Sequence, residues 1–283
     1  MDNAILLISC PDKKGITAQI SNFIYTNNGN IEHADQHIDS QTNTFFMRIE
    51  WSLKNFAIPK DKIMEKLSPL AKKFDMHCSL SFSDDIMRVA IFASRNLSCL
   101  HDLLLRQAEG QLRCKIPVVI SNHPEAEKIV KSSGIKFFKF PVTKKNKSQV
   151  EVKTAELLFK EKIDLIILAR YGQILSKKFL DKFPNRIINI HHSFLPAFAG
   201  EDPYGQAYRR GVKIIGATSH YVTEELDAGP IIEQDTVRIN HRDTIADLKI
   251  KGQDLEKIVL SRAVRWHLER KILIYNNKTV VFD

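Results

Sequence analysis

The sequence predicts an α/β protein in two parts, a small split β-α-β-β-α-β unit followed by a larger, mostly parallel α/β domain. In residues 1–83, two segments with helical period alternate with four strand-like apolar runs. From residue 84 onward, strands and helices follow one another singly, which is typical of a parallel sheet with helices on both faces. We therefore place a domain boundary in the polar stretch Ser83-Asp84-Asp85 and expect domains at 1–83 and 84–283.

The first part opens with an apolar strand and a polar turn. After residues 10–15, apolar side chains recur at helical spacing at Ile16, Ile20, Phe23 and Ile24. Gly29 suits the left-handed position that follows a last helical turn. The expected strands are Ala4–Ser9, Ile31–Asp39, Phe45–Leu53 and His77–Phe82, and the second helix covers about 60–74. This order is that of the ferredoxin-like split unit.

The second part reads as a Rossmann-like alternation. Strands are expected at Met87–Ala93, Ile116–Ser121, Lys136–Phe140, Leu165–Ala169 and Arg186–Ile190, and helices at Ser98–Glu109, Pro124–Ser133 and Ser148–Lys162. In such sheets ligands bind at the carboxyl ends of the strands, beside the reversal of strand order. Polar residues directly after strands are therefore the first candidates for a site.

Composition narrows the class of protein. Hydrophobic residues make up 43% and charged residues 27% of the 283, as in ordinary globular proteins. The sequence has no apolar run near the ~20 residues of a membrane span, and its first residues do not resemble a secretory signal. Four scattered cysteines (Cys10, Cys78, Cys99 and Cys114) form no C-x-x-C pair. We expect a reduced, cytoplasmic protein with no membrane partner.

The formal charge of +9 raises the question of a nucleic-acid partner. The densest basic cluster, Lys144–Lys147, has no interleaved aromatic residues for base stacking, and no nucleic-acid-binding motif follows it. We therefore expect no nucleic acid. A solvated lysine-rich surface and the steering of an anionic small molecule both remain open.

Two polar residues end a strand that otherwise reads as buried. Asn189 and His191 are two residues apart, so the period of a strand places them on one face. An amide and an imidazole on one face can polarise one carbonyl oxygen together. A strand-end histidine is also a common structural hydrogen bonder.

A second polar pair follows in 215–232. His220 lies in the strand-like segment 215–222, and Asp227 precedes a Gly-Pro turn from which a carboxylate can reach a cleft. Capping of the turn is the ordinary role of such an aspartate. Polar residues thus recur in the strand that carries Asn189 and His191, in the segment that carries His220 and in the turn that carries Asp227. This recurrence favours a functional site over separate structural roles.

The segments N-I-H-x-S-x-L-P (189–196), G-A-T-x-H-x-V (216–222) and L-D-x-G-P-I-I (226–232) resemble the folate-dependent formyltransferase fold. The resemblance implies a catalytic trio of Asn189, His191 and Asp227, supported by His220. It is closer to the formyltetrahydrofolate deformylases, through 191–198 and Ala169-Arg170-Tyr171. That family joins an N-terminal ACT domain to this catalytic domain.

The N-terminal part itself resembles an ACT domain, through 9–16 and Gly29-Asn30-Ile31. Lys14 departs from this family, which often has proline before the glycine. ACT domains commonly bind small amino acids where subunits pair. The resemblance therefore implies a homo-oligomer, with methionine and glycine as the first effectors to try.

The resemblance also implies a folate slot. Its expected residues are Gly172, Gln173, Ile174, Leu175, Thr223, Glu224, Glu225 and Leu226. Two positions depart from the family pattern: Gly172 stands where methionine is usual, and Gly205 where histidine is usual.

The activity implied is hydrolysis of the substrate 10-formyltetrahydrofolate to formate and tetrahydrofolate, which supplies one-carbon and purine metabolism, with no bound cofactor and no metal. His33 and His37 would lie about 13 Å apart on a strand and cannot share an ion. A related transferase holds a phosphate in a glycine-rich loop, whereas 93–97 has no glycine, and G-x-G-x-x-G is absent. Two alternatives remain, an N-formyltransferase to a small amine and an amino-acid-binding ACT regulator with a silent catalytic domain.

Overall fold

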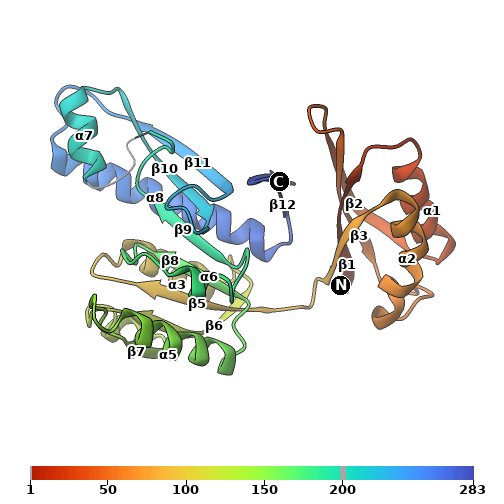
Figure 1. The fold of residues 1–283 in the computed structure, drawn as a ribbon, viewed down its shortest axis with the longest axis horizontal. Coiled ribbons are helices and arrows are strands. Elements are labelled where there is room, and N and C mark those ends of the chain that lie inside the picture. The colour runs from red at the N-terminus through yellow and green to blue at the C-terminus, as the bar shows by residue number, and fades with distance from the viewer. Residues whose placement is uncertain (1, 198–201) are drawn as a thin grey trace. The chain divides into compact units, whose positions relative to one another are not determined.

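The computed structural model describes residues 2–197 and 202–283, and the chain divides into two compact units (Figure 1). The N-terminal unit takes in the chain up to Ile86 together with Glu269–Leu273 and Val280–Asp283. The larger unit comprises Met87–Leu268 and Ile274–Thr279. Short C-terminal segments thus belong to the N-terminal unit, which the sequence pattern does not indicate. The domain limits 1–83 and 84–283 stay a prediction.

The N-terminal unit is a four-stranded antiparallel sheet in the order β2-β3-β1-β4, as the split unit requires. Its strands are β1 (Asn3–Pro11), β2 (Asn30–Asp39), β3 (Thr44–Ser52) and β4 (His77–Phe82), and its helices are α1 (Ile16–Thr26), η1 (Lys60–Lys62) and α2 (Ile63–Phe74). Alternate residues of β1 and β3, from Ala4 and Phe45 onward, pack against buried residues of α1 and α2 in one core cluster. The period-two pattern therefore builds the face that the helices cover.

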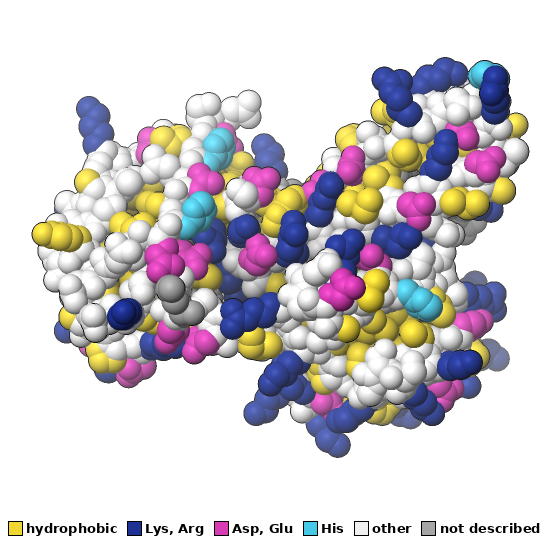
Figure 2. Space-filling view, turned by 180° about the vertical axis from the view of Figure 1, so that it is seen from behind, with side chains coloured by type: hydrophobic (Ala, Val, Ile, Leu, Met, Phe, Trp, Pro, Cys, Tyr) yellow, Lys and Arg dark blue, Asp and Glu magenta, His cyan; other side chains and the backbone are white. Residues whose placement is uncertain are grey.

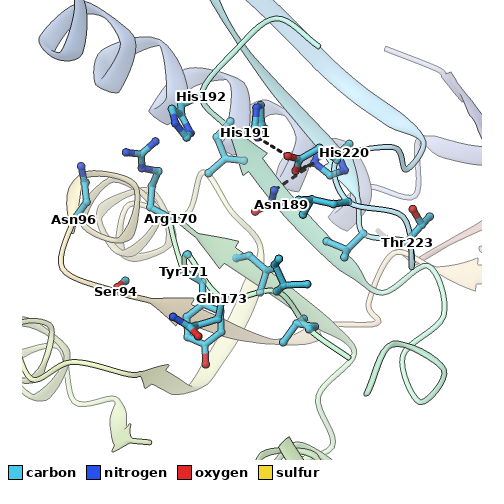
Figure 3. A pocket seen from close by; sticks show the side chains of 18 of the residues that line it. Ser94, Asn96, Arg170, Tyr171, Gln173, Asn189, His191, His192, His220 and Thr223 are labelled. Carbon is cyan, nitrogen blue, oxygen red and sulfur yellow. Dashed lines mark hydrogen bonds and ion pairs between the residues drawn. The ribbon is translucent and has the colours of Figure 1, made fainter. Parts of the chain in front are cut away.

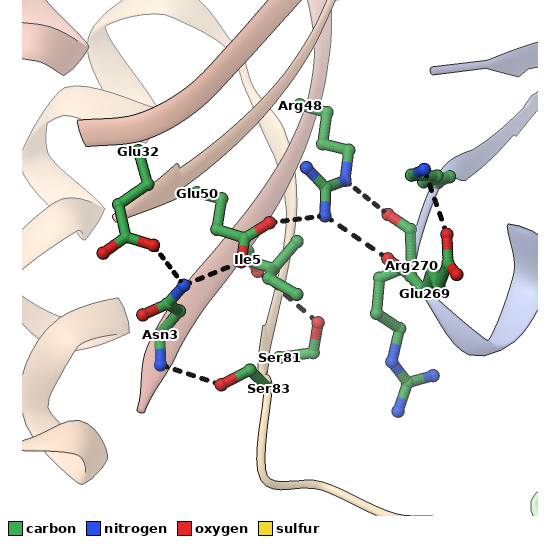
Figure 4. Close-up of polar contacts among 10 residues, drawn as sticks. Asn3, Ile5, Glu32, Arg48, Glu50, Ser81, Ser83, Glu269 and Arg270 are labelled. Atoms are coloured by element: carbon green, nitrogen blue, oxygen red, sulfur yellow. Dashed lines mark hydrogen bonds and ion pairs between the residues drawn. The ribbon is translucent and has the colours of Figure 1, made fainter. Parts of the chain in front are cut away.

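A polar network fixes the C-terminal segment within this unit (Figure 4). Arg48 of β3 is 3% exposed and donates to the Glu50 carboxylate at 2.8 Å. It also donates to the main-chain carbonyl oxygens of Arg270, at 3.2 Å, and Glu269, at 3.4 Å. Asn3 donates to the other carboxylate oxygen of Glu50 at 2.9 Å. A buried guanidinium needs such partners on every side, so the segment after residue 268 completes the site of Arg48.

The larger unit contains a seven-stranded sheet in the order β11-β10-β9-β8-β5-β6-β7 (Figure 1). Its strands are β5 (Met87–Ala93), β6 (Cys114–Ser121), β7 (Lys136–Lys139), β8 (Leu165–Ala169), β9 (Ile187–His191), β10 (Ile214–Tyr221) and β11 (Ile231–Arg238). The five strands from β7 to β9 are parallel, whereas β10 and β11 run antiparallel to their neighbours. The predicted mostly parallel α/β class is confirmed, and the antiparallel end was not predicted.

The helices of this unit are α3 (Ser98–Ala108), α4 (Glu127–Ser132), α5 (Lys147–Lys160), α6 (Lys177–Leu180), α7 (Pro203–Arg210) and the long α8 (Ile245–Leu268); β12 (Ile272–Tyr275) and β13 (Lys278–Val281) form a separate small sheet. Sequence periodicity did not reveal α6, α7 or α8. In the described part of the chain, no helix is both long and apolar enough to cross a membrane.

The strand order determines where a ligand site can form. From β5 the chain moves outward to β6 and β7, then returns to place β8 on the other side of β5. The connections therefore diverge between β5 and β8, and a crevice opens at the carboxyl ends of these strands. Ser94 follows β5 and Arg170 follows β8 at this edge.

Charged side chains are interspersed over the surface. On the face that Figure 2 shows, lysine and arginine side chains lie among acidic ones on both units. The excess of positive charge is therefore spread widely on this face. Its distribution is typical of a solvated surface.

Candidate active site

A pocket of about 550 Å³ lies at the reversal of strand order (Figure 3). Its walls come from the last residues of β8, β9 and β10 and from the segments that follow these strands and β5. They are formed by Ser94, Arg95, Asn96, Leu168, Arg170, Tyr171, Gly172, Gln173, Ile174, Leu175, Asn189, Ile190, His191, His192, His220, Val222, Thr223, Glu224, Leu226 and Asp227. The sequence-predicted trio and its supporting histidine thus line one cavity of a size suited to a small molecule.

Antiparallel pairing of β9 with β10 brings two of these side chains together. Asn189 lies opposite His220 in the strand register. The Asn189 Nδ2 atom is 3.3 Å from His220 Nε2, and His220 Nδ1 is 2.9 Å from the carbonyl oxygen of Tyr221. A carbonyl oxygen only accepts, so Nδ1 carries a proton and donates. In the neutral ring Nε2 then accepts from the Asn189 amide, which fixes the direction of that amide group.

Asp227 joins the two histidines. Its Oδ2 atom lies 3.2 Å from His191 Nδ1, and its Oδ1 atom lies 3.7 Å from His220 Nε2. The contact with His191, and then that with His220, holds the pKa of Asp227 well below its ordinary 3.8, against the opposing effect of burial. The carboxylate is therefore ionised throughout the neutral range. The ring of His191 is 6% exposed, and its Nε2 atom is buried without a hydrogen-bond partner among the described residues.

The loop that carries Asp227 closes tightly on the end of β10. The Tyr221 amide donates to the carbonyl oxygen of Pro230 at 2.9 Å. A β-carbon on Gly229 would lie 1.8 Å from the carbonyl oxygen of Tyr221, so only glycine fits this approach. Asn277 also donates to the carbonyl oxygen of Ala228 at 2.8 Å. Asp227 itself has a left-handed φ of 54°, which aspartate tolerates better than most residues.

Seven of the eight expected folate residues line the pocket, and Glu225 does not. The carbonyl oxygen of Glu225 accepts instead from the Thr223 hydroxyl at 3.2 Å. The Glu224 carboxylate forms an ion pair with Lys177 at 3.1 Å. Gly172 has a φ of 69° with open space around its α-carbon, so the departure from methionine relaxes the backbone here.

The second departure, Gly205, has a local structural reason. Asp202 accepts a hydrogen bond from the Gly205 amide at 3.2 Å and so caps helix α7. A β-carbon on Gly205 would lie 1.9 Å from that carboxylate. The glycine therefore accommodates the cap.

A buried cluster beside the trio was not found from the sequence. Glu256 of α8 is 0% exposed; it accepts from the Tyr204 hydroxyl at 2.7 Å and from Arg170 at 3.3 Å. Burial raises the pKa of Glu256, while Arg170 opposes that rise. Arg170 lines the pocket (Figure 3). The signal available was Arg170 itself, an arginine directly after an apolar strand, but its partner lies far along the chain.

His192 stands between Arg170 and His191 in this pocket (Figure 3). Its ring centroid is 5.2 Å from that of His191 and 5.8 Å from that of Tyr204. Burial, and then the nearby charges of Arg170 and His191, lower the pKa of His192 from 6.5 to about 3. His192 is therefore neutral at neutral pH.

A metal site would need several histidine, cysteine or acidic side chains close together. Across residues 2–197 and 202–283, no group of three or more His, Cys, Asp or Glu side chains could hold a metal ion. His33 and His37 both lie on strand β2, as expected.

Comparison with known proteins agrees with this architecture. The family model for formyl transferases matches residues 87–264, and the ACT domain model matches residues 4–71. A formyltetrahydrofolate deformylase from Synechocystis sp. is 53% identical over 99% of this chain and 98% of its own length. The crystal structure of a formyltetrahydrofolate deformylase from Pseudomonas syringae pv. tomato superposes with a TM-score of 0.97, at 45% identity, over 100% of this chain and 95% of that one.

A glycinamide ribonucleotide transformylase from Symbiobacterium toebii is structurally more distant. It has a TM-score of 0.66 at 30% identity and covers 72% of this chain and 98% of its own. The fold and the family models therefore define the chain as an ACT domain joined to an enzyme domain of the formyl transferase class. Within that class, the chain belongs to the formyltetrahydrofolate deformylase family.

Proposed function

We propose that the chain hydrolyses 10-formyltetrahydrofolate to formate and tetrahydrofolate, with Asn189, His191 and Asp227 as its catalytic residues and His220 in support. The observation that carries this proposal is the convergence of an amide, an imidazole and an ionised carboxylate in one pocket. The pocket residues at 172–175 and 223–226 would hold the folate, with Glu225 acting through the backbone of the loop.

The proposed chemistry follows the movement of charge. A water oxygen attacks the formyl carbon, and negative charge develops on the formyl oxygen as the tetrahedral intermediate forms. The free hydrogen of the Asn189 amide and a protonated His191 stabilise that oxygen; loss of one such donor typically costs about 10²–10³ in rate. The C–N10 bond then breaks, N10 takes a proton, and formate leaves.

Asp227 has two roles in this scheme. Its Oδ2 lies 3.2 Å from His191 Nδ1 and holds the ring in position. Its Oδ1 lies 3.7 Å from His220 Nε2, a long contact that leaves a lone pair to orient the attacking water and receive its proton. The proton then passes toward the departing N10 nitrogen.

Water is favoured over an amine as the acceptor by the loop after β5. Ser94, Arg95 and Asn96 line the pocket, and the segment 93–97 has no glycine to wrap a phosphate with backbone amides. A transferase would need another way to hold its acceptor.

The test is formate release from 10-formyltetrahydrofolate with no acceptor present. We expect steady turnover that glycinamide ribonucleotide does not accelerate. A saturable acceleration that yields formylated product would replace hydrolysis by transfer. Absence of reaction with any acceptor would leave a silent catalytic domain beside an amino-acid-binding regulator.

For the ACT domain we propose an amino-acid effector, methionine or glycine, and a homo-oligomer. The support is the ACT match at residues 4–71, with a left-handed Gly15 (φ 93°) closing the loop before α1. An effector acts only if it distinguishes two states of the assembly. Formate production with each amino acid, amide exchange over residues 9–31, and the mass in solution test these proposals. A response without protection of residues 9–31 would exclude this domain as the sensor.

A cytoplasmic location is also proposed. All four cysteines are free thiols, and burial raises the pKa of Cys10, Cys78 and Cys114 to about 11 and that of Cys99 to about 12. Such thiols are inert structural groups that suit a reducing compartment. Fractionation of cells that express the tagged chain tests the location.

A further inference from the structure

A lysine-rich groove lies beside the pocket. It measures about 640 Å³, and its basic residues are Lys144, Lys147, Lys178 and Lys182. They come from the start of α5 and from the region of α6, two helices that contact each other. The remaining walls are formed by Ser148, Glu151, Val152, Ser176, Phe179 and Asp181.

The four lysines are not neutralised by the protein. None of them forms an ion pair with a residue that the structure describes, whereas the adjacent Lys177 is paired with Asp181 at 3.2 Å and Glu224 at 3.1 Å. Of the two acids in the groove, Asp181 has this partner, and Glu151 accepts hydrogen bonds from the amide and hydroxyl of Ser176. The groove therefore carries unbalanced positive charge.

One segment connects the groove to the pocket. Gln173, Ile174 and Leu175 line the main pocket and also a narrow space that they share with Lys147 and Glu151. Ile174 is 62% exposed, so this strip is an apolar rim between the two. A ligand that leaves the pocket over this rim meets the lysines next.

We propose that this groove binds the γ-linked glutamyl chain of polyglutamylated folate. The inference rests on the proposed function, which places the folate in the pocket. Each added glutamyl unit carries one α-carboxylate, so the chain is a flexible polyanion. Lysine ammonium groups are compact charges on flexible stems, which suit mobile carboxylates better than fixed bidentate sites. Exposed pairs of this kind each strengthen binding only modestly and weaken in salt. Four together should therefore improve binding about tenfold or more.

The experiment compares 10-formyltetrahydrofolate that carries one glutamate with the form that carries five. The kcat and KM for formate release are measured in low and high salt for the full chain. We expect the pentaglutamate KM to be about tenfold lower, with most of the difference lost in high salt. The groove variant Lys144→Gln/Lys147→Gln/Lys178→Gln/Lys182→Gln should raise the pentaglutamate KM to the monoglutamate value and leave monoglutamate kinetics within about twofold.

The matched control removes the same charge elsewhere. The substitutions Lys115→Gln, Lys153→Gln, Lys213→Gln and Lys249→Gln change lysines of the same unit that lie outside the groove. This variant should keep the pentaglutamate preference. An equal loss of the pentaglutamate preference in both variants would show general electrostatic steering of the substrate. It would contradict binding in the groove. Equal KM values for the two substrates in the unchanged chain would overturn it as well.

A binding measurement separates this inference from the proposed function. Calorimetry with tetrahydrofolate mono- and pentaglutamate needs no turnover. Tighter binding of the pentaglutamate that disappears in the groove variant supports the groove, even if no formate is released. Formate release that does not depend on the number of glutamates would support the proposed hydrolysis. It would contradict binding of the glutamyl chain in the groove.

Discussion

The Nδ1 atom of His191, at the end of β9, lies 3.2 Å from Oδ2 of Asp227, in the loop that follows β10. This contact joins the end of β9 to the loop that follows the neighbouring strand β10. It fixes the ring of His191 and leaves its Nε2 atom as the nitrogen without a partner among the described residues. The proposed chemistry depends on this pair.

Replacement of Asp227 by Asn should lower kcat by about 10²–10³ or more, because the carboxylate that holds His191 and the acceptor for the proton of the attacking water are lost together. KM and the melting temperature should change little. Formate release and thermal unfolding measure both. Asp235→Asn serves as the control; it changes a half-buried aspartate of β11 that pairs with Arg262 at 3.1 Å and lies outside the pocket. Turnover at the unchanged rate would reduce Asp227 to a turn residue.

Replacement of Gly229 by Ala should destabilise the chain by about 1–3 kcal/mol and cost activity as well. The new β-carbon would lie 1.8 Å from the Tyr221 carbonyl oxygen, and backbone must move to relieve this. The displaced loop carries Asp227 away from His191. Gly134→Ala is the comparison, since its surroundings are open and only its φ of 71° is strained. The free energy of unfolding in denaturant and kcat should both fall further for Gly229→Ala than for Gly134→Ala. Equal values for the two variants would contradict the close approach of Gly229 to the Tyr221 carbonyl oxygen.

Glu256 should tolerate Gln but not Ala. Burial raises its pKa, and Gln keeps a side-chain oxygen that can accept from Arg170 and Tyr204. We expect Glu256→Gln to cost within about 1 kcal/mol, and Glu256→Ala about 3 kcal/mol or more because Arg170 and Tyr204 lose their shared partner. Urea unfolding measures both variants. Comparable losses for Gln and Ala would mean that the carboxylate charge is required.

His192 should make stability depend on pH below neutrality. Its pKa falls from 6.5 to about 3 on folding, so between these values the unfolded chain binds the proton and the folded chain does not. The free energy of unfolding therefore rises with pH across this window, by at most about 1.4 kcal/mol per pH unit from this group. Urea unfolding from pH 4.5 to 7.5 should show a shallower slope for His192→Gln. An unchanged slope would assign the dependence to other groups.

The sequence by itself determined the elements whose signal is local. Short apolar runs predicted the strands of both units, and in the larger unit β5 and β8 are continuous apolar runs because both of their faces are buried. The placement of Asn189 and His191 on one face of β9 followed from the period of a strand. The resemblance of the motifs around them predicted the family, which the comparisons confirm.

The tertiary structure decided what depends on pairing between distant segments. Antiparallel pairing of β9 with β10 places His220 opposite Asn189, and nothing local in 214–221 specifies that register. Helix α8 brings Glu256 to Arg170, and the segment after it supplies carbonyl oxygens to Arg48. Such contacts close loops of many residues and are set by the packing of whole elements. A single sequence shows each partner but not the contact.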